Sequence, residues 1–298
     1  LISVLNTNIN KWGNSIIMSR THGQPASPTS MGKEYNVFLY RLNNQYNNKI
    51  KVYTKFGGAV GNFNAHYLTY PNIDWVSFAN EFVNDLGLIR SEYTTQIENY
   101  DSLSNILDNI KRMNTILIDL CQDTWLYISY NYFKLKIVNS EVGSSTMPHK
   151  VNPIDFENAE GNLYLSNSLI EMMTRKLPIS RLQRDLTDST ITRNIGSVFA
   201  YSIIAFKSII NGLYKLEINK DIIQKDLDDN WVIITEGIQH ILRKKGLKGY
   251  EILKKLTRSH TSLTKKSLID SLKCYLDDDE MEQLKKLVPE NYTGMIHS

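Results

Sequence analysis

Cysteine is nearly absent from this chain, which has two such residues, Cys121 and Cys274, among 298. Both lie within helical patterns and far apart along the sequence, so we interpret them as free thiols. Such sparing use of cysteine is typical of a reducing compartment, and we expect the protein to be cytoplasmic. It also excludes a disulfide-stapled fold and a zinc site built on cysteine.

Long apolar runs and a dominant charge are missing as well. We find no run of about eighteen apolar residues and no charged-then-apolar leader at the start, so we expect no membrane-spanning helix. The net charge is only +3, from 34 basic and 31 acidic residues, so no global field indicates nucleic acid or an anionic membrane as a partner. Any anion must therefore be bound by a local group of residues.

Helical periodicity is what the sequence has in abundance. Apolar residues recur at helical spacing over 1–17, 30–53, 75–86, 103–133 and 191–213. The pattern over 103–133 contains no Pro or Gly, and roughly thirty such residues make about 45 Å of helix. We predict an all-α fold with a long-helix bundle domain over 1–213. A smaller all-α C-terminal domain is expected over 214–298, where the helices shorten and lysines cluster.

One segment between the long helical patterns gathers groups that suit an anion. It lies within 140–153 and reads Gly143-Ser144-Ser145-Thr146-Met147-Pro148-His149-Lys150-Val151-Asn152-Pro153. Hydroxyl, imidazole, ammonium and amide groups in such a stretch are typical of a mobile loop that closes over an anion. Its end predicts a helix start, with Asn152 as N-cap, Pro153 at the first helical position and acidic residues in the first turns.

Two further loops carry most of the remaining reactive side chains. The stretch 19–28 holds His22, and two prolines and a glycine there interrupt the preceding helix. The stretch 176–188 is rich in cations, including Arg184, and is followed by Ser189 and Arg193. Long antiparallel helices place such loops at bundle ends, or at mid-bundle where chains pack together, so a shared site is geometrically reasonable.

Four segments together carry a resemblance to a known family. They are residues 143–153, 176–194, 19–26 (Ser-Arg-Thr-His-Gly-Gln-Pro-Ala) and 58–62 (Gly-Ala-Val-Gly-Asn). The first looks like the signature of the fumarase and aspartase superfamily. With His149 inside it and the other three segments, the chain resembles the adenylosuccinate lyases of the bacterial-type branch over essentially its whole length.

The resemblance implies β-elimination of fumarate from adenylosuccinate to give AMP, and from SAICAR to give AICAR, in purine biosynthesis. That reaction needs a base for a proton beside a carboxylate and an acid for the leaving nitrogen. By resemblance, Ser144 is the base, with Ser145 as the alternative, in an electropositive site that Lys150 and the helix start help to create. His22 resembles the general acid, and Glu157 the carboxylate that orients its imidazole.

The resemblance also implies how the substrate is held. Thr21, Lys150 and Asn152 would bind the carboxylates of the substrate, and Gln96 and Asn158 would be further contacts. Arg184, Ser189 and Arg193 look like the phosphate and ribose contacts, because a guanidinium group can donate two parallel hydrogen bonds to one phosphate. We leave Lys176 and Arg181 outside the site as a solvated cationic edge. Neither a cofactor nor a metal is implied.

The family assembles as a homotetramer whose sites are shared between subunits, and the extensive apolar stripes of this chain agree with that. The family also has an N-terminal domain with further site residues, and this chain starts after it. We therefore expect residues 1–298 alone to have little or no lyase activity. We expect small-molecule ligands, namely adenylosuccinate, SAICAR, AMP and fumarate.

Two other interpretations stay open at this point. Another fumarate-releasing lyase, such as argininosuccinate lyase or fumarase, would share the Ser144 loop but would have no reason to keep the segment from Arg184 to Arg193. A non-catalytic helical scaffold would show no change when Ser144 is replaced by alanine.

Overall fold

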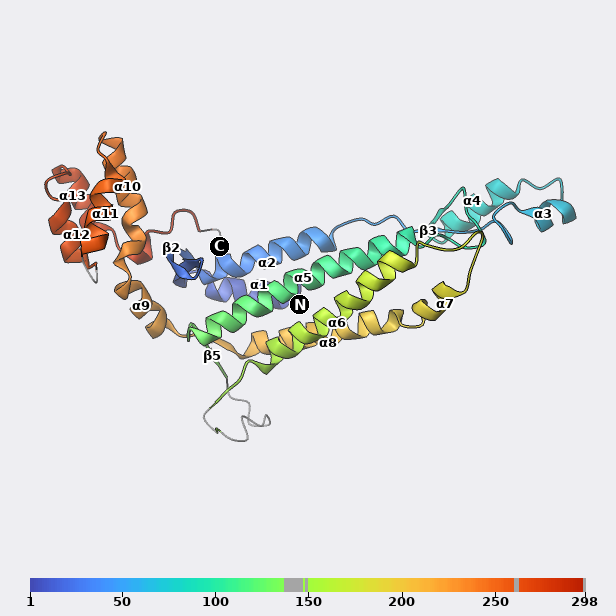
Figure 1. The fold of residues 1–298 in the computed structure, drawn as a ribbon, viewed down its shortest axis with the longest axis horizontal. Helices are drawn as coiled ribbons and strands as arrows, with labels where there is room; N and C mark the ends of the chain where they lie inside the picture. Colours follow the sequence, from blue (N-terminus) through green and yellow to red (C-terminus); the bar gives the residue numbers. More distant parts are fainter. Residues whose placement is uncertain (137–146, 148–149, 260–262, 297–298) are drawn as a thin grey trace. The chain divides into compact units, whose positions relative to one another are not determined.

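The computed structural model describes residues 1–136, 147, 150–259 and 263–296 (Figure 1). Helices dominate, and the all-α class predicted from the sequence is confirmed. The helices are α1 (Ile2–Trp12), α2 (Met31–Tyr46), α3 (Asn64–Thr69), α4 (Trp75–Asp85), α5 (Asp101–Ser129), α6 (Ile154–Lys176), α7 (Thr187–Thr192), α8 (Ile195–Lys215), α9 (Lys220–Asp229), α10 (Thr235–Lys244), α11 (Gly249–Ser259), α12 (Lys265–Leu272) and α13 (Asp278–Lys286), with 3-10 turns η1 (Trp231–Ile234) and η2 (Pro289–Asn291). The short strands are β1 (Ile16–Thr21), β2 (Gln24–Ser30), β3 (Tyr53–Thr54), β4 (Ile89–Arg90), β5 (Phe133–Leu135) and β6 (Leu216–Ile218).

The contacts between residues divide the chain into two compact units. Unit 1 consists of Leu1, Tyr40–Thr124 and Pro153–Gly212, and unit 2 of Ile2–Leu39, Trp125–Asn152 and Leu213–Ser298. Each unit collects segments that are distant in the sequence. The domain boundary that we place between 213 and 214 follows chain order instead, and it stays a prediction.

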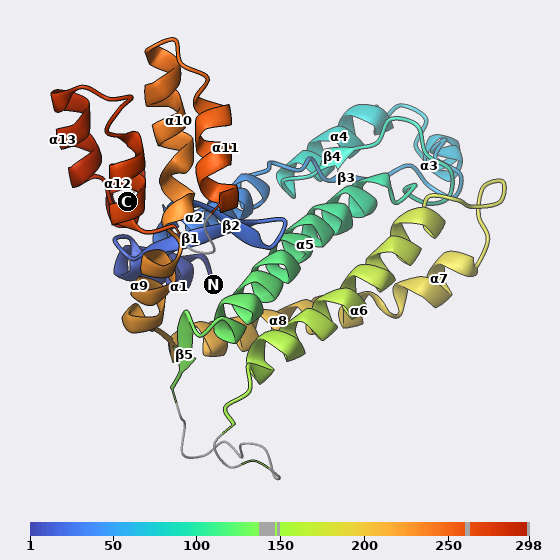
Figure 2. The ribbon, with the colours of Figure 1, turned by 60° about the vertical axis from the view of Figure 1, so that its left-hand side comes forward.

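Unit 1 is built on α5, α6 and α8, which lie side by side (Figures 1 and 2). Ile170, Met173 and Leu177 are spaced three and four residues apart, so they share one helix face and pack with Leu107 of α5 and Val198 of α8. All five side chains are buried. This cluster is the fixed core against which the loops at the end of α6 are placed.

A polar layer also crosses the three long helices of unit 1. The side-chain amide of Asn114 in α5 donates to Ser166 Oγ in α6 at 3.2 Å and to Ser202 Oγ in α8 at 3.0 Å. All three side chains are buried, so these hydrogen bonds offset the cost of removing polar atoms from water. Because hydrogen bonds are directional, they also specify how the three helices align along one another.

Unit 2 is centred on aromatic side chains. The ring of Trp12 lies 4.9 Å from the rings of both Tyr35 and Phe133, and all three side chains are buried. Phe133 belongs to β5, which pairs antiparallel with β6 and places Phe133 opposite Ile218. The helices α10 to α13 stand together in the same unit (Figure 2).

The segment 19–28 is not an irregular loop but part of a β-hairpin, which corrects the sequence-based expectation. The helix α1 ends at Trp12, so Ile16 and Ile17 start β1 rather than continue a helix. Thr21 pairs with Gln24 across the turn. Both strands of a two-stranded sheet are edge strands, so the two prolines of β2 remove no hydrogen bond that the sheet requires. Because proline is otherwise rare in strands, the same two residues hid the strand from sequence-based prediction.

Three predicted helix boundaries also differ from the structure. α2 ends at Tyr46 rather than continuing to residue 53, and the pattern over 191–213 is divided between α7 and α8. α6 begins at Ile154, with Pro153 in the N-cap position and no side-chain cap. Asn152 is therefore not the N-cap, because Pro153, with φ −78° and ψ 46°, is itself outside the helical region and the first helical residue is Ile154.

One segment, Thr187–Lys215, is long and apolar enough by length and composition to cross a membrane. The structure gives a simpler account of it. The segment is divided at residues 193–194 into α7 and α8, and Ser202 of α8 joins the buried polar layer of unit 1. Among the described residues, no cluster of three or more His, Cys, Asp or Glu side chains has the geometry of a metal site.

Candidate functional site

His22 and Gly23 form the tip of the β1–β2 hairpin in unit 2. Their φ angles are 53° and 75°, so both occupy the left-handed region that a two-residue hairpin turn requires. The side chains of Thr21 and His22 are exposed to solvent. The turn therefore presents an imidazole and a hydroxyl on a short, conformationally defined support.

The hairpin is attached to the rest of unit 2 by a group of partly buried polar side chains. Arg20 of β1 forms an ion pair with Asp226 of α9, with 2.9 Å between NH2 and Oδ2. The hydroxyl of Tyr132 donates to the same carboxylate, and the Arg20 guanidinium lies over the ring of Tyr130 at 4.9 Å. Burial and the bond to Asp226 raise the pKa of Tyr132, so its hydroxyl stays protonated and donates.

The proposed base lies outside the described residues, as do Ser145 and His149. Lys150 and Asn152 are described in unit 2 and precede α6, with Lys150 exposed and Asn152 half-buried. Glu157 and Asn158 are exposed in the first turns of α6, in unit 1, and Asn158 Nδ2 donates to Ser208 Oγ at 2.7 Å. The pairing of His22 with Glu157 stays a prediction.

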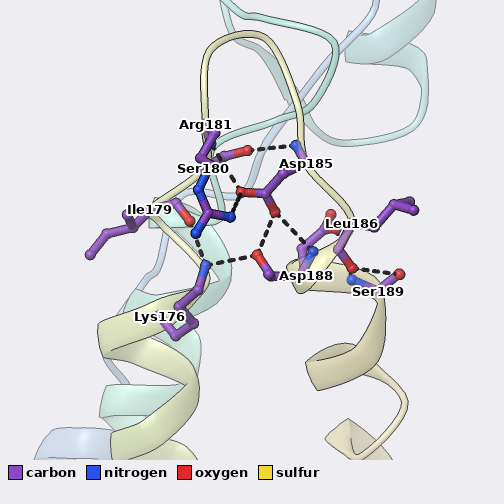
Figure 3. Close-up of polar contacts among 9 residues, drawn as sticks. Lys176, Ile179, Ser180, Arg181, Asp185, Leu186, Asp188 and Ser189 are labelled. Carbon is purple, nitrogen blue, oxygen red and sulfur yellow. Dashed lines mark hydrogen bonds and ion pairs between the residues drawn. The ribbon is translucent and has the colours of Figure 1, made fainter.

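The loop between α6 and α7 is tied together around one carboxylate (Figure 3). Asp185 accepts from the backbone N–H of Arg181 at 3.1 Å, from that of Thr187 at 2.8 Å and from the Thr187 hydroxyl. Lys176, at the end of α6, donates to Ile179 O at 2.7 Å and to Thr187 Oγ1 at 3.0 Å. Lys176 is therefore a brace inside the loop rather than a solvated edge.

The charge on Asp185 is stabilised by the same contacts. The hydrogen bonds from Thr187, together with Arg181, lower the pKa of Asp185 from 3.8 to about 2. Arg181 itself has 78% of its side chain exposed, so its ion pair with Asp185 adds little to stability. Asp185 thus fixes the loop mainly through backbone and hydroxyl donors.

The second carboxylate of this loop is buried. Asp188, in the first turn of α7, is 6% exposed. Its Oδ1 accepts from the backbone N–H of Ser189 at 2.8 Å, and its Oδ2 accepts from the hydroxyl of Tyr100 at 2.8 Å. The Ser189 hydroxyl donates to Leu186 O at 2.9 Å.

Gln96 lies beside this loop. Its backbone N–H donates to Gln183 O at 3.2 Å, and its carbonyl accepts from Lys55 Nζ, which also donates to Gly58 O. The Gln96 side chain is exposed. Gln96 is therefore anchored on one side to the residue before Arg184 and on the other to the Gly57–Gly58 turn.

The structure thus brings together part of the predicted site. Unit 1 holds Gln96, Arg184, Ser189 and Arg193 on connected segments, with both guanidinium groups exposed. Among the described residues, neither arginine forms an ion pair with a carboxylate. An exposed guanidinium without a carboxylate partner is suited to an anion such as phosphate. Thr21, His22, Lys150 and Asn152 belong to unit 2.

Sequence reasoning missed the residues that support the site. Lys55, Tyr100, Asp185, Asp188 and Asp226 were not singled out for any role, although two of them lie in the segment 176–194 that carries the resemblance. A carboxylate between hydroxyl residues in a loop was the one available signal, because such groups tend to bond to nearby backbone N–H. Nothing local indicated the partners of Tyr100 or Asp226.

Two family models match the chain. The model described as Lyase matches residues 1–164, and the model described as Adenylosuccinate lyase C-terminal matches residues 180–293. Adenylosuccinate lyase of Dictyostelium discoideum is 54% identical over 297 residues, which cover 96% of this chain and 63% of the relative. Adenylosuccinate lyase of Escherichia coli K12 is 49% identical over 283 residues, covering 93% of this chain and 62% of the relative. The chain thus spans less than two thirds of these relatives.

Solved structures agree on the fold. A 3-carboxy-cis,cis-muconate lactonizing enzyme from Pseudomonas putida superposes with a TM-score of 0.73 at 17% identity, over 98% of this chain and 67% of that one. A fumarate lyase:delta crystallin from Brucella melitensis gives a TM-score of 0.70 at 18% identity, over 97% of this chain and 63% of that one. At such low identity these structures support the fold alone. The two family models and the two relatives lead to one conclusion: the chain belongs to the adenylosuccinate lyase family.

Proposed function

We propose that the protein catalyses the β-elimination of fumarate from adenylosuccinate to give AMP, and from SAICAR to give AICAR, with little or no activity from residues 1–298 alone. The observation that carries the proposal is the hydrogen bond between Gln96 N–H and Gln183 O. It places Gln96, a candidate succinyl contact, against the residue that precedes Arg184, so one ligand with a carboxylate and a phosphate would suit both residues. The curated relatives named adenylosuccinate lyase support the same substrate.

The proposed chemistry divides between two proton transfers. Ser144, once deprotonated, takes the proton from the carbon beside a substrate carboxylate, and Lys150 with the amide of Asn152 stabilises the growing negative charge. His22, oriented by Glu157, donates a proton to the leaving nitrogen as the carbon–nitrogen bond breaks. Thr21, Gln96 and Asn158 hold the succinyl group, while Arg184, Ser189 and Arg193 hold the phosphate and ribose.

We further propose that the protein works as a cytoplasmic homotetramer with sites shared between subunits. Exposed apolar side chains on the long helices support this, including Leu165 of α6 at 52% and Ile203 of α8 at 51% exposure. Light scattering coupled to size-exclusion chromatography measures the assembly directly, and a monomer at micromolar concentration would contradict it.

The activity is tested by following fumarate release from adenylosuccinate at high enzyme concentration. Because the chain spans 62% of the Escherichia coli relative, two forms are assayed: residues 1–298, and these residues extended at Leu1 by the preceding segment of that relative. We call whichever form releases fumarate the active form. Release from argininosuccinate instead would identify a different lyase, and no release by either form from any of these substrates would refute the proposal.

The base is tested by Ser144→Ala with Ser145→Ala as its matched control. We expect Ser144→Ala to lower kcat of the active form by about a hundredfold or more, as loss of a general base does. A larger loss for Ser145→Ala would assign the proton transfer to Ser145. Unchanged activity in both variants would show that neither serine is the general base.

A further inference from the structure

The buried pair Tyr100–Asp188 has no role in the mechanism above, although it lies within the segment proposed to bind phosphate. Tyr100 immediately precedes α5, and Asp188 is in α7, 88 positions further along the chain. Their hydrogen bond of 2.8 Å links the start of α5 to α7 through side chains. Asp188 directly precedes Ser189, which is one of the candidate phosphate and ribose contacts.

Tyr100 is a fixed point of unit 1. Its ring packs against the buried cluster formed by Leu107, Ile170, Met173, Leu177 and Val198. Its backbone N–H donates to Glu98 Oε2 at 2.7 Å, and its φ of 62° lies in the left-handed region. Such a conformation is unfavourable for a non-glycine residue and persists where the surroundings determine it. The hydroxyl of Tyr100 is therefore presented from a well-defined position.

Asp188 connects that position to the candidate phosphate contacts. One carboxylate oxygen is bound to the Tyr100 hydroxyl and the other to the backbone N–H of Ser189. Both oxygens of the buried carboxylate thus have a donor, which offsets the cost of burying its charge. Burial and this hydrogen bond raise the pKa of Tyr100 to about 12, so the phenol remains a donor at neutral pH.

The same pairing bears on Arg184. Arg184 lies four positions before Asp188, in the short loop that the Asp185 carboxylate ties together, so the guanidinium and the Asp188 carboxylate belong to one fixed segment. Among the described residues Arg184 forms no ion pair with a carboxylate, whereas Asp188 already has a donor on each oxygen. Removing the Tyr100 hydroxyl would leave one carboxylate oxygen unpaired, and a nearby guanidinium is the group best able to satisfy it.

We propose that Tyr100 and Asp188 are positioning residues for the phosphate subsite: Tyr100 holds the Asp188 carboxylate, fixes Ser189 and leaves Arg184 free to bind the phosphate of the nucleotide. The inference rests on the proposed function, since it takes AMP as a product. It predicts an effect on the nucleotide half of the ligand and none on the succinyl half.

The test measures product inhibition of the active form by AMP and by fumarate separately. Tyr100→Phe removes the hydroxyl and keeps the ring, and Tyr93→Phe is its matched control because Tyr93 is 85% exposed. We expect Tyr100→Phe to raise the inhibition constant of AMP about tenfold or more, the size expected for a lost hydrogen bond to a charged group. The inhibition constant of fumarate should change less than about twofold.

A second pair of variants separates positioning from a general loss of structure. In Tyr100→Phe/Asp188→Asn the neutral amide cannot form an ion pair with Arg184, so AMP inhibition should recover to within about threefold of wild type. Asp188→Ala alone removes the acceptors of both the Tyr100 hydroxyl and the Ser189 N–H, so it should raise the inhibition constant of AMP about tenfold and leave that of fumarate within about twofold. This single variant keeps the test valid if Tyr100→Phe does not fold.

Three results would overturn the inference: Tyr100→Phe behaving like Tyr93→Phe, Tyr100→Phe weakening AMP and fumarate equally, or Asp188→Ala leaving AMP inhibition within about threefold of wild type. Absence of fumarate release in both forms of the wild-type protein is a different result. It would refute the proposed function itself.

Discussion

Arg20 of β1 and Asp226 of α9 form a hydrogen-bonded ion pair of 2.9 Å across 206 positions of sequence. Each side chain is only 26% exposed, and the Tyr132 hydroxyl binds the same carboxylate. Because Arg20 directly precedes Thr21 and His22, this pair attaches the hairpin that carries the candidate acid to a helix from the C-terminal third of the chain.

Asp226→Ala should destabilise the protein. The change leaves the Arg20 guanidinium and the Tyr132 hydroxyl partly buried without their acceptor, so we expect a loss of about 2 kcal/mol in the free energy of unfolding. Denaturant titration measures it. Glu217→Ala is the matched control, because the Lys136–Glu217 pair is 48% and 53% exposed and should contribute at most about 0.5 kcal/mol. Equal losses in both variants would contradict this prediction.

His22→Asn should preserve the conformation of the hairpin turn while removing the proposed general acid. Asparagine tolerates the left-handed conformation that His22 adopts, so stability should change little, whereas kcat of the active form should fall about a hundredfold or more. Gly23→Ala is the complementary change. Nothing lies within 4 Å of the added methyl group, but φ is +75°, so backbone strain should cost about 1 kcal/mol of stability. A fully active His22→Asn would exclude His22 as the acid.

Asp185 should make the stability of the loop between α6 and α7 depend on acid pH. Its folded-state pKa of about 2 is lower than the ordinary 3.8, so its contribution is fully present above about pH 4. That contribution is lost as the pH falls through about 2. The difference in free energy of unfolding between wild type and Asp185→Asn should therefore be constant near neutrality and shrink between about pH 4 and pH 2. A difference independent of pH would contradict the assignment.

Lys55 should affect the succinyl half of the site. It donates to Gln96 O and Gly58 O, and burial lowers the pKa of Lys55. Lys55→Met removes both bonds with a similar side-chain length, so Gln96 should lose its anchor and the inhibition constant of fumarate should rise about tenfold. Lys49→Met, at an exposed lysine, is the control. If the inhibition constant of AMP rose instead of that of fumarate, Gln96 would not belong to the succinyl half of the site.

The sequence by itself determined the helical class, because periodicity of apolar residues is a local property of each helix. The pattern without Pro or Gly over 103–133 became the 29-residue helix α5. The motifs also identified the family. Local signals were weaker at ends and turns, where the hairpin with His22 and the start of α6 after Pro153 were missed.

Only the tertiary structure decided which side chains support the candidate site. The partners Tyr100 and Asp188 are 88 positions apart, and Arg20 and Asp226 are 206 apart. Their pairing depends on how whole helices pack, which a periodic pattern does not encode. The candidate contacts were readable from the sequence because chemistry requires particular residue types. Their supports were not, because almost any polar residue is compatible with such a role until the fold supplies its partner.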